Sequence, residues 1–279
     1  MRELAEANIQ QPPVLRGLTS PELRELAHAK ALLENPGFAA RVASLLGGSV
    51  ERGFKLLPKG WSHAVHKAAR AALFKSVQVA VLTLDRKSGK KSSEKFHKLL
   101  VGASGGVAGV FGLPALPIEL PLSTTIMLRS IAQIARSEGH DIRDVSVKLS
   151  CLQVFALGGR SRDDDAAEGG YWAVRMALAK SISEAASYIA EKGLVEQSAP
   201  AIVRLVSSIA ERFGVVVSEQ VAAKAVPILG AAAGSAINVL FMDHFQDMAR
   251  GHFIVRRLEN LHGCERVREV YQTLAIPMR

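Results

Sequence analysis

The sequence predicts an all-α fold, organised as a compact multi-helix domain. The residues that favour helices, Ala, Leu, Arg, Lys and Glu, dominate the 279 positions. Apolar residues recur three or four positions apart along most long segments, which is the helical period, and the alternation typical of strands is almost absent. Two charge-free segments rich in glycine and proline interrupt this pattern. We expect them to form apolar helical hairpins packed at the centre of the domain.

The first clear helix start is Ser20-Pro21-Glu22, which combines an N-cap, a proline at the first helical position and an acid in the first turn. This helix is expected to end near Asn35-Pro36. The other predicted helices are Phe38–Leu46, Ser62–Asp85, Ser123–Glu138, Ile142–Leu157, Tyr171–Glu191, Ala199–Phe213, Val215–Ala225, Ala231–Leu261 and Cys264–Leu274. We interpret residues 1–60 as an N-terminal helical extension and 61–279 as the main helical domain, within one structural unit.

The chain carries 35 Lys and Arg against 26 Asp and Glu, a net charge of +9. Such an excess favours anionic partners, either nucleic acid or a phospholipid surface. Aromatic residues make up only 5% and do not alternate with a basic run, so we expect a phospholipid surface as the partner and not nucleic acid. Cys151 and Cys264 are too few for a disulfide framework and lack zinc-site spacing. We therefore predict no metal and no cofactor.

The first apolar segment, Leu99 to Ile118, holds twenty residues without a charge, about the length that spans a bilayer. Pro114 and Pro117 would break a continuous helix, so a buried or re-entrant hairpin fits better. The second segment, 225–242, is also free of charge. Both contain glycines four apart, which let two helices approach closely. They are either tightly packed core helices of a soluble protein or a hairpin that enters or docks on a membrane.

Three sequence blocks carry a family resemblance. They are GLPALPIELPLSTTIMLRSIAQIARSEGHD (112–141), CLQVFALGG (151–159) and VPILGAAAGSAINVLFMDHFQDMARGHFIVRRLE (226–259). Together they resemble the bacterial EcsC family, over roughly 96–271. The family takes its name from a gene beside an ABC exporter, and the resemblance implies a cytoplasmic or peripheral membrane protein without an established activity. It also makes an ABC transporter or another membrane assembly a possible partner.

Polar residues beside the apolar segments are candidates for binding a ligand or a lipid headgroup, because apolar grooves with a few polar groups are typical binding sites. If Ser123 caps a helix, Glu119 and Arg129 could form a partly buried ion pair. The candidate ligand- or lipid-binding residues are Thr124, Thr125, Arg129, Asn238, Arg250, Arg256 and Arg257.

Catalytic residues are unknown from the sequence, with Glu119, Asp243 and Asp247 as candidates. Asp243 and Asp247 lie one helical turn apart on a shared face. Together with Glu119 they would serve an enzyme that acts on a lipid or envelope precursor. His244 beside them lacks the spacing of a metal site. In the alternative interpretation, Asp247 forms an ion pair with Arg250 or with an arginine on a neighbouring helix.

A basic set directly precedes the first apolar segment, where the headgroups of an anionic membrane would lie. It consists of Arg86, Lys87, Lys90, Lys91, Lys95 and Lys98. The alternative is a solvated loop. With no apolar leader in residues 1–11, we expect a cytoplasmic, non-enzymatic protein at the inner face of the cell membrane that binds anionic lipid or a membrane assembly. The alternatives are the lipid or envelope-precursor enzyme and a soluble helical adaptor.

Overall fold

The computed structural model describes residues 17–34, 37–46, 50–84, 116–159, 170–193, 196, 198–225 and 230–274. These residues form ten helices and no strand, so the predicted all-α class is confirmed. The helices are α1 (Ser20–Leu33), α2 (Phe38–Leu46), α3 (Val50–Leu56), α4 (Trp61–Thr83), α6 (Leu116–Ser137), α7 (Val145–Leu157), α8 (Gly170–Lys192), α9 (Pro200–Lys224), α10 (Gly230–His262) and α11 (Cys264–Thr273).

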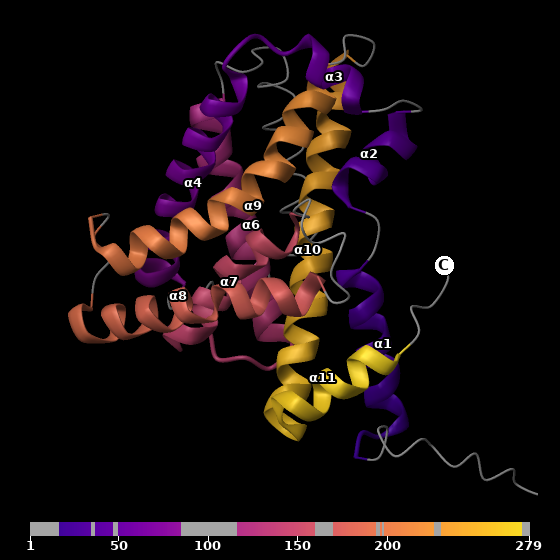
Figure 1. Ribbon diagram of the computed structural model, residues 1–279, viewed down its shortest axis with the longest axis vertical. Coiled ribbons are helices and arrows are strands. Elements are labelled where there is room, and N and C mark those ends of the chain that lie inside the picture. The colour runs from indigo at the N-terminus through magenta and orange to yellow at the C-terminus, as the bar shows by residue number, and fades with distance from the viewer. Residues whose placement is uncertain are drawn as a thin grey trace, which may run out of the picture.

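The long helix α10 organises the molecule (Figure 1), with α1 and α2 along one side and α6, α7 and α9 packed against other faces. Near its end, α6 bonds the end of α4 through Arg136, which donates to the carbonyl of Leu84 at 2.6 Å. The paired helices α4 and α6 therefore run parallel. The start of α6 lies against the end of α9, where α3 also packs. One end of the molecule thus gathers α3, the starts of α4 and α6, and the end of α9.

Three helix boundaries differ from the sequence prediction for identifiable reasons. The N-cap of α1 is Thr19, whose hydroxyl accepts from the backbone N–H of Glu22. The carboxylate of Glu22 accepts in turn from the backbone N–H of Thr19, which completes a capping box. Helix α6 begins at Leu116, not at Ser123. Helix α9 is continuous through Gly214, where two helices were expected, because this buried glycine lets the ring of His66 pack against the helix.

The prolines of α6 explain its early start. Pro117 lies in the first turn, where the backbone N–H has no helical partner to lose. Pro121 lies inside the helix and removes one backbone hydrogen bond. Side-chain hydroxyls bond the carbonyls of this region: Thr124 donates to Leu120 O at 2.6 Å and Thr125 to Pro121 O at 2.8 Å. The sequence-based boundary was wrong because it treated Pro117 as a helix breaker and placed the start of the helix at Ser123.

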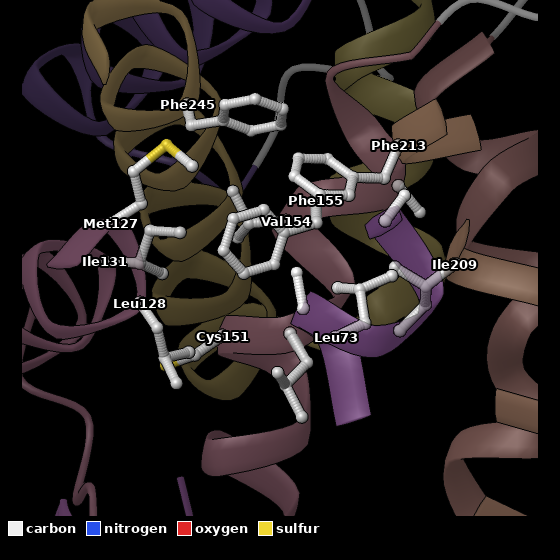
Figure 2. Packing of buried hydrophobic residues seen from close by; sticks show 14 of the residues in the cluster. Leu73, Met127, Leu128, Ile131, Cys151, Val154, Phe155, Ile209, Phe213 and Phe245 are labelled. Carbon is white, nitrogen blue, oxygen red and sulfur yellow. The ribbon is translucent and has the colours of Figure 1, made fainter. Parts of the chain in front are cut away.

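The core is aromatic at its centre and aliphatic around it. Figure 2 shows Phe155 of α7, Phe213 of α9 and Phe245 of α10 facing one another, with Met127 and Ile131 of α6 nearby. The ring centroids of the three phenylalanines lie 5.1 to 5.6 Å apart in tilted or edge-to-face arrangements. Such pairs add stability beyond the burial of area alone. This centre joins three helices that are far apart in the sequence.

The two glycine-rich segments have different outcomes. Residues 99–115 of the first segment lie outside the described part of the chain, so its hairpin stays a prediction, and residues 116–118 begin α6. In the second segment, residues 230–242 form the first turns of α10. Among the described helices, none is long and apolar enough to cross a membrane. The predicted domain boundary near residue 60 stays a prediction; α1 packs along α10, and α3 packs on α9.

Candidate functional site

A buried polar cluster joins the start of α6 to the end of α9 and the first half of α10. The carboxylate of Glu119 accepts from Lys224 Nζ at 2.8 Å and from Asn238 Nδ2 at 3.4 Å. Asn238 Oδ1 accepts in turn from Gln220 Nε2 at 2.9 Å. The side chains of Glu119 and Lys224 are only 13% and 17% exposed, so their charges are mostly removed from water. The cluster therefore ties three helices together through mutually satisfied polar groups.

The expected ion pair between Glu119 and Arg129 is wrong. Arg129 is exposed on the outer face of α6, whereas Glu119 faces α9 and bonds Lys224. Ten residues of helix rotate the side chain by about 1000°, which places these two residues some 80° apart and nearly three turns distant along the axis. The polar partner of Glu119 could not be chosen from the sequence because it lies 105 positions away.

Asp247 is held in a structural ion pair, as one interpretation of the sequence predicted. Its Oδ2 lies 2.9 Å from Nη1 of Arg41 on α2, and its Oδ1 lies 3.7 Å from Nη1 of Arg250. Asn238 and Asp247 are nine residues apart on α10, so they point to opposite sides of the helix. The structure therefore does not bring Asp247 together with Glu119. The half-buried Asp243 lies between them along the same helix.

The neighbouring His244 has a structural role. Its Nε2 donates to the carbonyl of Gly158 at 2.8 Å, and its ring packs against Phe38 and Phe245. Within the part of the chain that the structure describes, no group of three His, Cys, Asp or Glu side chains is gathered to hold a metal.

A second buried cluster, which the sequence did not indicate, surrounds the last third of α10. Arg175 of α8 forms a bidentate ion pair with Glu259 at 2.7 and 2.9 Å, and its guanidinium lies 4.8 Å from the ring centroid of Trp172. Arg175 also donates to the hydroxyl of Tyr171 at 3.3 Å, and that hydroxyl lies 3.0 Å from Nδ1 of His252. Burial lowers the pKa of His252 well below its ordinary value, with the nearby arginines adding to the effect.

Two candidate ligand-binding arginines have different surroundings. Arg257 forms ion pairs with Glu25 of α1 at 3.0 Å and with Glu138 at 3.2 Å, so it connects α1 and the residue that follows α6 to α10. Arg256 points the other way and donates to the hydroxyl of Ser150 on α7. That hydroxyl donates its own proton to Ser146 O at 2.8 Å. Burial lowers the pKa of Arg256, and Arg175 lowers it further.

The basic set Arg86, Lys87, Lys90, Lys91, Lys95 and Lys98 lies outside the described residues. The exposed basic side chains that the structure does describe include a group on and beside α3, α4 and α6: Arg52, Lys55, Lys59, Lys67, Arg70, Lys75 and Arg129. The described residues of 52–137 include one acid, Glu119, and it is paired with Lys224. Exposed apolar side chains lie among them: Leu56 and Leu82 are 55% and 65% exposed, and Ile118 and Leu122 are 79% and 53% exposed. We refer to this set of exposed residues on and beside α3, α4 and α6 as the basic face.

The family model of the EcsC protein family matches residues 20–258. The chain belongs to the EcsC family. The resemblance expected from the sequence is therefore confirmed. No curated protein and no solved structure matches this EcsC-family chain. The blocks that carry the resemblance form most of α6, α7 and α10, the helices that contribute Glu119, Ser150 and Arg256 to the two buried clusters.

Proposed function

We propose that this EcsC-family chain is a peripheral membrane protein that binds anionic phospholipid through its basic face. The supporting observation is the segregation of charge. Among the described residues, one exposed acid lies on helices α3, α4 and α6, Glu51 at the start of α3, and the other exposed acids lie elsewhere, such as Glu191 on α8, Glu211 on α9 and Glu265 on α11. On the basic face, cations stand beside exposed leucine and isoleucine side chains. Basic residues attract an anionic surface, and apolar side chains add contact with the acyl boundary.

The geometry of α4 supports the proposal. This helix contains no acid in 23 residues, and Lys67, Arg70 and Lys75 are all exposed along it. It lies at an outer edge of the molecule (Figure 1), beside α6, which carries Ile118, Leu122 and Arg129. A surface made by two parallel helices offers an extended contact to a flat membrane. Each basic residue near an anionic leaflet contributes about 1 kcal/mol.

Flotation with vesicles tests the proposal. Vesicles of phosphatidylcholine alone and of phosphatidylcholine with about one third phosphatidylglycerol are compared at low and high salt. We expect binding only to the anionic vesicles, with most of it lost at high salt because salt screens exposed charges. The triple variant Lys67→Gln, Arg70→Gln, Lys75→Gln should lower the partition coefficient about 100-fold, since three contributions of about 1 kcal/mol are removed.

A matched control removes the same charge elsewhere. The variant Lys180→Gln, Lys192→Gln, Arg204→Gln changes three exposed cations on α8 and α9. It should keep nearly all of the binding if the basic face is the contact surface. Equal losses in the two triple variants would show that net charge alone drives binding. The double variant Ile118→Ser, Leu122→Ser is expected to reduce the binding that persists at high salt.

We place the protein at the inner, cytoplasmic face of the cell membrane, because that leaflet carries the anionic lipid that the basic face would meet. An ABC transporter or another membrane assembly is proposed as the partner that the membrane-bound chain would approach. Co-purification from crosslinked membranes, compared between the chain and its α4 triple variant, tests whether such a partner depends on prior membrane binding.

A further inference from the structure

The buried cluster at α7, α8 and α10 has more positive charge than its carboxylates balance. Glu259 gives both oxygens to Arg175. Among the described residues no carboxylate lies within salt-bridge distance of Arg256, which donates a hydrogen bond to the neutral hydroxyl of Ser150. The cluster thus holds two guanidinium groups and one carboxylate. A charge removed from water is costly unless an opposite charge or several hydrogen bonds compensate it.

The hydrogen bonds of Tyr171 fix the direction of a second donor. Its hydroxyl accepts from Arg175, and among the described residues Nδ1 of His252 is the acceptor within reach of its own proton, so we assign the phenol proton to the bond with Nδ1. Neutral histidine carries one ring proton, and with Nδ1 accepting, that proton is on Nε2. Nε2 of His252 is buried and has no hydrogen-bond partner among the described residues. His252 and Arg256 are four residues apart, so both lie on the same face of α10.

We propose that the junction of α7, α8 and α10 binds a small oxyanion, with Arg256 as the main ligand and the Nε2 proton of His252 as a further donor. A phosphate group is the best chemical match, because the planar guanidinium presents paired N–H donors to phosphate oxygens. Ser150 orients the guanidinium from α7, because its own proton is committed to Ser146 and its oxygen can only accept from Arg256. This site is separate from the basic face and does not depend on membrane binding.

Thermal unfolding in inorganic phosphate, compared with chloride at equal ionic strength, tests the site. At a phosphate concentration about ten times its dissociation constant, the midpoint temperature of thermal unfolding should rise by about 3 °C. Arg256→Met should abolish this rise. In chloride the same variant should be about as stable as the wild-type protein, because it removes a buried charge together with its hydrogen bond. Arg129→Met, which changes an exposed arginine of the basic face, should keep the full rise.

Two further arms complete the test. Arg256→Lys keeps the charge but loses the paired donors, so phosphate binding should weaken about tenfold; this variant carries the test if Arg256→Met does not fold. Vesicles containing phosphatidic acid, which ends in a phosphate, are compared with phosphatidylglycerol vesicles. A preference for phosphatidic acid that Arg256→Met removes assigns the phosphate to a lipid headgroup, and a preference unchanged in Arg256→Met assigns it to a soluble compound. An equal phosphate effect in wild type and Arg256→Met, or none in either, overturns the proposal.

Discussion

Gly53 lies where α3 touches α9 most closely, and Gly53→Ala should destabilise the protein. A Cβ atom added at this position would lie 1.8 Å from the carbonyl oxygen of Ala222 and 2.5 Å from its carbonyl carbon. Both atoms belong to the backbone, so no side-chain rotation relieves the clash. The same carbonyl accepts from the N–H of Ala225 at 3.1 Å, which closes the last turn of α9. Displacement of the oxygen would disturb that bond, which the N–H of Ala225 shares with the carbonyl of Val221 at 3.1 Å.

The size of the effect follows from two opposing contributions. Alanine in place of glycine favours a helix by about 1 kcal/mol. Relief of the clash requires α3 to move about 1.5 Å away from α9, since ordinary contacts begin near 3.4 Å. Overpacking of this kind costs about 1 to 3 kcal/mol, and more where the backbone itself is displaced. We expect the free energy of unfolding to fall by about 2 kcal/mol.

Urea unfolding followed by circular dichroism measures this difference as a lower midpoint at an unchanged slope. Gly170→Ala is the control, because Gly170 opens α8 and a Cβ there meets nothing within 4 Å. The control should be neutral or more stable. Because α3 carries Arg52 and Lys55 of the basic face, Gly53→Ala should also weaken vesicle binding. A Gly53→Ala protein as stable as the wild type would refute the close packing of α3 on α9.

Two other predictions concern buried carboxylates. Burial raises the pKa of Glu219 on α9 to about 7, so burial of its ionised form opposes folding. The stability that its protonated form contributes is present at low pH and is lost as the pH rises through 7. Relative to wild type, Glu219→Gln should therefore gain up to about 3 kcal/mol in unfolding free energy between pH 5 and pH 8, and a gain independent of pH would contradict this reasoning. Lys224→Met should lower the unfolding free energy by about 3 kcal/mol, because it leaves the partly buried Glu119 without its cation. Adding Glu119→Gln to this variant should recover much of the loss. A double-mutant cycle that shows no coupling between the two positions would disprove the pairing.

Local sequence patterns were enough for the fold class, the family and most helix positions. Apolar spacing identifies a helix because the period is set by the backbone over a few residues. The same local signals failed at α6, which begins before Pro117 and not at Ser123, and at α9, which runs through Gly214 where two helices were expected. Pro117 costs no backbone hydrogen bond because it lies in the first turn of α6, and Gly214 lets the ring of His66 on α4 pack against α9. The short α3 was not predicted.

The sequence by itself determined that this chain is helical, basic and a member of the EcsC family, because composition and local periodicity carry that information. Only the tertiary structure decided which polar groups meet. Glu119 was identified as a candidate, but its partner Lys224 and the cluster of Arg175, Glu259 and His252 were not. Those contacts depend on the rotation of each helix about its axis and on which helices pack together, and both are fixed by side-chain packing between segments distant in the sequence.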